Sequence, residues 1–151
     1  MEDEVCMGLA LAEAEKAFRL GEVPVGAVIV HEGKVIAAAH NMRETWKDAT
    51  AHAEVIAIRE ACRKLDRWRL SGCTLYVTVE PCPMCGGAIF NSRLERVVFG
   101  CRDNKAGAVE SLFNILTHPS LNHQPQVIGG LMERECAAVM KRFFEARRNK
   151  G

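Results

Sequence analysis

The sequence has no long apolar segment, little net charge and few aromatic residues. No apolar run approaches the ~18 residues of a membrane-spanning helix, so we expect no membrane span. The formal net charge is only +1, so the total charge does not indicate a nucleic-acid partner. Internal repeats, low-complexity segments and linkers are also missing. We therefore expect one folded domain over residues 1–151.

A disulfide framework is absent as well. The seven cysteines are an odd number, and no secretory signal peptide precedes them, so we expect the reducing cytoplasm. A structural zinc site with four protein ligands would need a second close pair of Cys or His. Apart from one Cys-x-x-Cys motif, the cysteines are scattered singly: Cys6, Cys62, Cys73, Cys101 and Cys136.

The charge that is present is unevenly distributed. Residues 1–15 contain acidic side chains and no Lys or Arg, whereas the C-terminal end is basic. A basic end is usually a solvated helix face, and it is also a feature of proteins that bind RNA. The basic residues at this end are Lys141, Arg142, Arg147, Arg148 and Lys150.

The clearest motif is the Cys-x-x-Cys at Cys82 and Cys85, which follows a strand-like run at 74–79. Pro83 suits the first position of a helix, which makes Cys82 the N-cap residue. Cys85 then lies on the same side of the first turn. The positive helix end is expected to lower the pKa of both thiols, and thiolates bind metals.

His52 is the natural third ligand. It precedes a second helical pattern that Asp48 or Thr50 can cap, so His52 lies near the first turn of that helix. One histidine and two cysteines leave a fourth tetrahedral position for water, which is typical of a catalytic zinc. A redox-active cysteine pair is the alternative interpretation of Cys82 and Cys85 alone.

Glu54 lies two residues after His52 and is the expected general acid/base. A zinc ion with an open position makes water a nucleophile at neutral pH, and such chemistry needs a proton carrier. Glu54 would take a proton from the water, protonate a ring nitrogen and then protonate the departing amine. The alternative is a first-turn residue that only favours the helix dipole.

Apolar spacing and β-branched runs predict the remaining elements. Helices are expected at 7–18, 52–65, 82–91, 109–116 and 131–148. Strands are expected at 25–30, 34–40, 74–79, 96–100 and 127–128. Glu32-Gly33 is the expected hairpin turn, and Asn41 begins a polar loop that runs to Asp48. This order predicts an α/β protein with a mixed five-stranded sheet covered on both faces.

The two motifs together are similar to the signature of the zinc nucleobase deaminases. More narrowly, the chain resembles the bacterial tRNA-specific adenosine deaminases, which convert wobble adenosine 34 of a tRNA to inosine. The matching stretches cover nearly the whole chain: 22–28, 50–54, 75–82, 96–100, 102–107, 121–123, Phe143-Phe144 and Arg147-Arg148. Two positions depart from the family pattern, since Ala49 stands where proline is expected and Gln124 where a basic residue is expected.

The resemblance implies a three-layer α/β/α cytidine-deaminase-like fold, a homodimer and a tRNA anticodon stem-loop as the partner. It also implies that Asn41 hydrogen-bonds the adenosine, that Val25 lines the pocket, and that the Ala53 backbone contacts the base. The Pro81 carbonyl would accept a hydrogen bond from the amine or the water. The expected RNA-binding residues are Arg102, Asp103, Lys105, Phe143, Arg147 and Arg148, whereas Phe144 is expected to lie in the core.

Two other functions remain open at this stage. A free-base deaminase acting on guanine or cytosine shares the zinc motif but does not need a basic, aromatic C-terminal helix. An RNA-binding module with structural zinc would not need Glu54. The first would deaminate free nucleobases, and the second would deaminate nothing.

Overall fold

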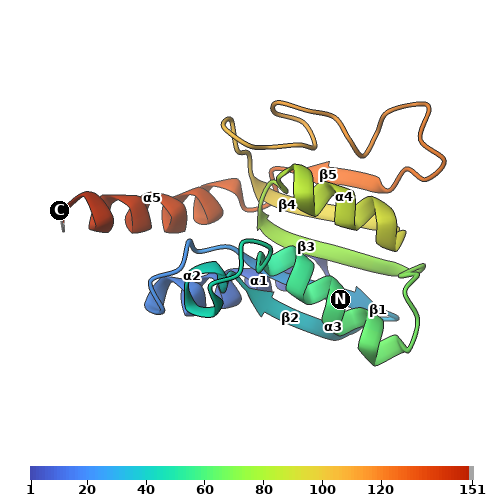
Figure 1. Ribbon diagram of the computed structural model, residues 1–151, viewed down its shortest axis with the longest axis horizontal. Coiled ribbons are helices and arrows are strands. Elements are labelled where there is room, and N and C mark those ends of the chain that lie inside the picture. The colour runs from blue at the N-terminus through green and yellow to red at the C-terminus, as the bar shows by residue number, and fades with distance from the viewer. Residues whose placement is uncertain (150–151) are drawn as a thin grey trace.

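A mixed sheet of five strands, in the order β2-β1-β3-β4-β5, forms the centre of the molecule. The computed structural model describes residues 1–149. The antiparallel half contains β1 (Gly26–His31), β2 (Lys34–His40) and β3 (Cys73–Val79). The parallel half adds β4 (Arg96–Cys101) and β5 (Gln126–Gly129) beside β3. The predicted sheet is thus confirmed, including its short last strand (Figure 1).

Two helices cover each face of this sheet. α3 (Ala53–Leu65) and α4 (Pro83–Ser92) contact each other on one face, and both begin at the edge near α5 in Figure 1. α1 (Asp3–Arg19) and α5 (Glu133–Asn149) contact each other on the opposite face. This is the expected α/β/α arrangement. It brings the start of α3 and the start of α4 together at the C-terminal ends of β2 and β3.

The hairpin turn and the end of the first helix, both predicted from the sequence, are also confirmed. Glu32 and Gly33 both have positive φ, at 49° and 75°, as a tight hairpin turn requires. α1 ends at Arg19, and Gly21 follows with φ of 80°. None of the helices within residues 1–149 has the length and apolarity needed to cross a bilayer.

The helix predicted at 109–116 is wrong, because this stretch consists of turns and bends. Its apolar spacing imitates a helix, but its N–H groups bond elsewhere. The N–H groups of Leu112 and Phe113 donate to the Gly107 carbonyl. The segment between β4 and β5 therefore has no regular helix, and it runs beyond α4 and β5 at the top of Figure 1.

The short helix α2 (Arg43–Trp46) was not predicted. Only four residues form it, which is too few for a periodic apolar pattern. The buried carboxylate of Glu22 accepts the N–H groups of Glu44 and Thr45, and Lys47 ends the helix with φ of 53°. A distant side chain, not local sequence, stabilises this element.

Candidate metal centre and active site

Three potential metal ligands meet where two helices begin. His52 is the N-cap residue of α3, and Cys82 is the N-cap residue of α4, followed by Pro83. Cys85 lies in the first turn of α4 and is fully buried. The ligand atoms of the three side chains lie within 4.8 Å of one another, and residues 1–149 contain no other group of this kind. The structure therefore brings together the three residues that the sequence predicted as ligands.

The spacing of these atoms fits a zinc ion. His52 Nδ1 lies 3.7 Å from Cys82 Sγ and 3.5 Å from Cys85 Sγ. A tetrahedral zinc with bonds of about 2.0 Å to nitrogen and 2.3 Å to sulfur separates such atoms by about 3.5 Å. Because the donor set has three members, one coordination position is left for water or substrate.

The two thiols differ in acidity. The hydrogen bond from Cys85, followed by the interaction with His52, lowers the pKa of Cys82 to about 4. The same hydrogen bond, with burial, raises the pKa of Cys85, because Cys85 is the donor. The expected lowering of the thiol pKa is present for Cys82, with the Cys85 thiol and His52 as its main causes, and is wrong for Cys85. A bound metal would displace this shared proton.

Glu54 lies beside the ligands and is only 4% exposed. It lines the same cavity as His52 and Cys82, which has a volume of about 160 Å³. Burial raises the pKa of Glu54 to about 7. A carboxyl group that titrates near neutral pH can both accept and release a proton during turnover.

Of the four residues expected to bind the base, two line the cavity with their side chains, and two have backbone groups that are already hydrogen-bonded. Asn41 and Val25 line the cavity with Glu54. The Ala53 N–H donates to Asn41 Oδ1 at 2.8 Å, and Ala53 is fully buried. The Pro81 carbonyl accepts the N–H of Ala108 at 2.9 Å and keeps a second lone pair. The amide NH₂ of Asn41 therefore remains for a substrate, while the Ala53 N–H is already bonded.

Asn41 also corrects the expected helix cap. The sequence assigned the cap of α3 to Asp48 or Thr50, but the Asp48 carboxylate bonds the N–H and hydroxyl of Thr50, both at 2.8 Å. Asn41 instead accepts the first N–H of the helix. The cap comes from outside the local sequence, so local reasoning could not find it.

Three expected RNA-binding residues line a second cavity, of about 440 Å³, beside the first. Lys105 forms no ion pair with the described residues, whereas Arg102 pairs with Glu110 at 3.1 Å and with Glu133 at 3.3 Å. Asp103 accepts the N–H groups of Lys105 and Ala106. Lys105 is therefore the cation of this group that is most available to a phosphate. The two cavities share Val79, Asp103 and Met140.

The aromatic pair of α5 has the opposite arrangement from the one expected. Phe143 is 4% exposed and packs edge-on against Phe18 of α1, with ring centroids 5.9 Å apart. Phe144, expected in the core, is 46% exposed and lines the cavity beside Lys105. The Arg147 guanidinium lies over the Phe143 ring at 5.1 Å, and Arg148 is exposed. Phe143 thus supports Arg147 from below, and Phe144 presents the accessible ring.

Two buried acidic residues beside the cavity had no role predicted from the sequence. Glu80 and Glu22 are 3% and 1% exposed, and each accepts several N–H groups of a neighbouring loop. Burial raises the pKa of Glu80, but the Ser111 hydroxyl and backbone N–H groups lower it to about 2. A carboxylate directly after an apolar strand is a signal that could have found Glu80, since a buried charge needs partners.

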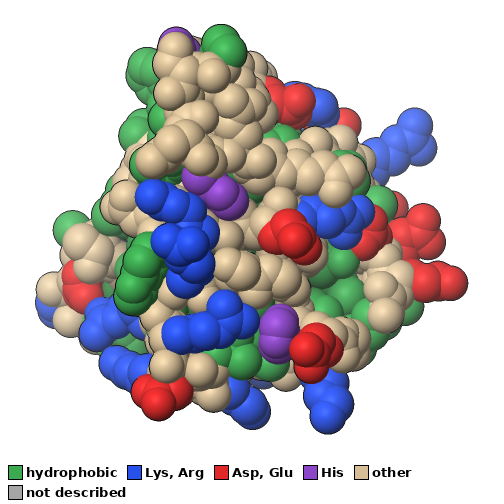
Figure 2. Space-filling view, turned by 90° about the vertical axis from the view of Figure 1, so that its right-hand side faces the viewer, with side chains coloured by type: hydrophobic (Ala, Val, Ile, Leu, Met, Phe, Trp, Pro, Cys, Tyr) green, Lys and Arg blue, Asp and Glu red, His purple; other side chains and the backbone are tan. Residues whose placement is uncertain are grey.

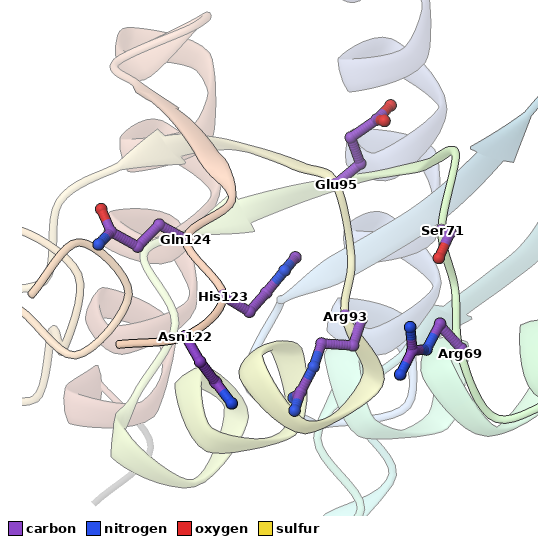
Figure 3. A pocket seen from close by; sticks show the side chains of 7 residues that line it. All are labelled: Arg69, Ser71, Arg93, Glu95, Asn122, His123 and Gln124. Carbon is purple, nitrogen blue, oxygen red and sulfur yellow. The ribbon is translucent and has the colours of Figure 1, made fainter. Parts of the chain in front are cut away.

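A further cavity, of about 420 Å³, lies beyond the opposite ends of β3 and β4. Arg93 and Asn122 point toward the bottom of the view in Figure 3, Arg69 extends sideways toward Arg93, and Glu95 points away from all three. Lys and Arg side chains gather on this end of the molecule, which faces the viewer in Figure 2. None of the residues predicted for catalysis or metal binding lines this cavity.

Comparison with known proteins gives the same assignment as the site. Residues 1–148 match the family model of the MafB19-like deaminases. A tRNA-specific adenosine deaminase of Bacillus subtilis (strain 168) is 51% identical over 149 residues, which are 99% of this chain and 92% of that protein. These shares leave no large part of either chain unmatched.

Solved structures show the same relationship. One, from a study of A-to-I editing by tRNA:A34 deaminases at the wobble position of transfer RNA, is 47% identical with a TM-score of 0.86, covering 89% of this chain and 98% of that one. The guanine deaminase of Bacillus subtilis is less similar, at 33% identity and a TM-score of 0.66, covering 99% of this chain and 95% of that one. The chain has the cytidine-deaminase-like fold and belongs to the family of tRNA-specific adenosine deaminases.

Proposed function

We propose that this protein hydrolytically deaminates adenosine 34, the wobble nucleoside of a tRNA anticodon loop, to inosine. The observation that carries the proposal is a buried Glu54 in one small cavity with His52 and Cys82, in a chain of this family. The net reaction at adenine C6 adds water and releases ammonia. The chemistry needs a metal, a proton carrier and a base held in position, and the cavity offers residues for each.

His52, Cys82 and Cys85 would hold one zinc ion per chain. When bound, zinc lowers the pKa of water to near 7 and so supplies a nucleophile at neutral pH. Glu54 accepts one proton from the attacking water and delivers it to a ring nitrogen. It then takes the second proton from the hydroxyl group added at C6 and passes it to the amine, which leaves as ammonia. Its raised pKa, about 7, suits both directions of transfer. Burial excludes bulk water from the carboxyl group.

The base is held by the cavity wall. Asn41 contacts it with the amide NH₂, because Oδ1 already accepts the Ala53 N–H. Ala53 therefore acts by fixing the orientation of Asn41. Val25 packs against the base, and the free lone pair of the Pro81 carbonyl accepts from the amine or the water. Adenine is therefore recognised by the NH₂ group of Asn41, whose orientation the Ala53 N–H fixes.

RNA is bound around the mouth of the cavity. A stacked base cannot reach a buried site, so the loop must be splayed and its phosphates neutralised. Lys105, Arg147 and Arg148 are the exposed cations for this role, with Arg102 contributing less because it is ion-paired. Asp103 keeps one carboxylate oxygen for a ribose hydroxyl. Phe143 supports Arg147, and Phe144 offers a stacking surface.

We further propose a single domain over residues 1–151 that acts as a homodimer. Large apolar side chains remain exposed on α2, on α4 and in the segment between β4 and β5, as a subunit interface would require: Trp46, Met84, Leu112 and Phe113. Light scattering should then give twice the mass of the 16.7 kDa chain. Action on tRNA implies the cytoplasm as the working compartment.

The direct test is to measure inosine in an anticodon stem-loop beside free guanine, cytosine and cytidine. We expect deamination of adenosine 34 in the stem-loop and none of the free bases. Turnover of guanine or cytosine without turnover of RNA would instead identify a free-base deaminase. Binding of RNA without any deamination would identify a binding module with structural zinc.

A further inference from the structure

Glu80 connects the metal-binding segment to a loop that borders the cavity. It is the residue before Pro81-Cys82, and its carboxylate is 3% exposed. Oε2 accepts the N–H groups of three consecutive residues, Val109, Glu110 and Ser111, at 2.8 to 3.1 Å. Oε1 accepts the N–H of Asp103 at 3.1 Å and the hydroxyl of Ser111. One carboxylate thus fixes both ends of the segment 103–111.

Gly107 shows how closely this segment lies on the carboxylate. A Cβ atom at Gly107 would lie 2.5 Å from Glu80 Cδ and 2.5 Å from the Asp103 carbonyl oxygen. Neither atom can move easily, since one is held by hydrogen bonds and the other belongs to the backbone. The close approach therefore requires glycine, and it makes the position of the segment depend on Glu80.

The opposite side of the cavity has the same construction. Glu22, 1% exposed, accepts the N–H of Glu44 at 3.1 Å and the N–H and hydroxyl of Thr45 at 2.6 and 2.7 Å. These bonds hold α2, and Arg43 of α2 lines the cavity. The segment held by Glu80 contributes Asp103 and Ala106 to the same cavity. Two buried carboxylates therefore hold two bordering segments, one from each side.

We propose that Glu80 and Glu22 are substrate-positioning residues that hold the two rims of the cavity, 103–111 and 43–46, in the shape that receives the splayed RNA loop. The inference rests on the proposed function, because the rims matter only if a loop is bound between them. Lys105 and Asp103, the candidate phosphate and ribose contacts, stand on the rim held by Glu80. Neither carboxylate takes part in proton transfer in this proposal.

If a rim is ordered in only a fraction of the molecules, the apparent Kd for RNA is the intrinsic Kd divided by that fraction. Glu80→Gln replaces one carboxylate oxygen by an NH₂ group that faces N–H or O–H donors, whichever way the amide turns. Losing hydrogen bonds to a charged group typically shifts such an equilibrium by tenfold or more. We therefore expect the Kd for an anticodon stem-loop to rise at fixed salt, by roughly tenfold if the rim remains ordered in about a tenth of the molecules.

Three variants make the experiment specific. Gly107→Ala crowds the same carboxylate from the loop side and should share the phenotype of Glu80→Gln. Glu22→Gln should also weaken binding, through the other rim. Asp3→Asn removes the charge and one of the two oxygens that accept from Arg96, at the far end of β4, and serves as a control for loss of stability without loss of RNA binding.

The readouts are the Kd for a labelled stem-loop, zinc content, the single-turnover rate at saturating RNA, and amide hydrogen exchange of peptides covering 103–111. In Glu80→Gln we expect faster exchange in these peptides and a raised Kd, with zinc retained and a smaller effect on the saturated rate. An unchanged Kd, or equal weakening in Asp3→Asn, would overturn the proposal. Hydrogen exchange needs no RNA, so failure of the wild-type protein to bind or deaminate the stem-loop would count against the proposed function instead.

Discussion

Asn41 Oδ1 accepts the backbone N–H of Ala53 at 2.8 Å, so one amide side chain caps α3 and lines the cavity that contains Glu54. The two residues are twelve positions apart in the sequence, across the polar loop that follows β2. Through this bond the start of α3, including His52, is fixed to the end of β2. Changes at Asn41 should therefore affect both stability and substrate binding, and the two effects can be separated.

Asn41→Ala removes the cap and the proposed donor to the base. We expect a loss of about 1 kcal/mol in the free energy of unfolding, the usual cost of losing a helix cap, and a large loss of kcat/KM. Asn41→Asp keeps an acceptor for the Ala53 N–H but has no NH₂ group. It should retain most of the stability and still lose activity. If Asn41→Asp is as active as wild type, the amide does not contact the base.

The metal centre makes a second prediction. Purified protein should contain about one zinc per chain, since three protein ligands bind a single ion with an open position. Cys85→Ser should lose the metal, because a hydroxyl is a much poorer zinc ligand than a thiolate. Cys62→Ser is the matched control, since Cys62 donates to the Trp68 carbonyl and lies outside the metal group. Equal zinc in both variants, measured by elemental analysis, would contradict the assignment.

A third prediction separates proton transfer from binding. Glu54→Gln keeps the size of the side chain, so zinc content and affinity for RNA should remain close to wild type. The single-turnover rate should fall at least ~10²-fold, which is the usual contribution of a positioned proton carrier. Glu60→Gln, on the same helix but outside the cavity, should deaminate normally. A Glu54→Gln rate near wild type would show that another residue carries the proton.

Local sequence signals predicted the parts of the fold that short-range physics determines. The Pro83 signal located the start of α4, and Glu32-Gly33 located the hairpin. Two failures share a cause. The stretch 109–116 has helical apolar spacing, but its N–H groups bond to Glu80 and Gly107, and α3 is capped by Asn41. Glu80 and Asn41 are 29 and 12 positions away from the N–H groups that they accept, so no local pattern could reveal these two partners.

In the site, too, some features follow from local sequence and others depend on distant contacts. The candidate ligand residues and Glu54 carry their chemistry in their identity and spacing, so the sequence predicted that they would lie together. Which face of α5 meets the sheet depends on α1, and the sequence alone suggested that Phe144 was the core residue. The contact with Phe18 buries Phe143, so Phe143 and not Phe144 is the core residue. Roles that depend on packing between distant helices required the structure.

Acid stability gives a fourth prediction, far from the metal. Hydrogen bonds from Arg96 and then Tyr76 lower the pKa of Asp3 to about 2 despite partial burial, and the N-terminal amine acts in the same direction. Because the pKa is lower in the folded protein than its ordinary 3.8, the stabilisation is complete above about pH 4 and is lost as the pH falls toward 2. Partial exposure reduces it to about 1 kcal/mol.

The measurement compares wild type with Asp3→Asn by urea unfolding at about pH 6 and again at about pH 2.5. The difference in unfolding free energy should be largest at the higher pH and should shrink at the lower one. Loss of metal in acid affects both proteins and cancels in the difference. Glu2→Gln changes a neighbouring exposed carboxyl group and should show no such trend. A difference that is independent of pH would exclude the ion pair as its source.

The last prediction concerns the cations that we propose to bind RNA. Lys105 and Arg147 lie outside every ion pair among the described residues, whereas Arg102 pairs with Glu110 and Glu133. Removing one cation that binds a phosphate should lower the slope of log K against log salt by roughly 0.7 to 0.9. Lys105→Gln and Arg147→Gln should each do so, and Arg102→Gln should do so less.

Truncation after Glu145 removes Arg147, Arg148 and Lys150, and the loss of the two proposed phosphate contacts of Arg147 and Arg148 should lower the slope by about twice that amount. Phe143 stays in place against Phe18, so zinc content and folding should be retained. Phe144→Ala should weaken binding without changing the salt slope, because a ring contributes by stacking and not by charge. If the truncated protein binds and edits a stem-loop with unchanged KM and salt dependence, the end of α5 has only a structural role.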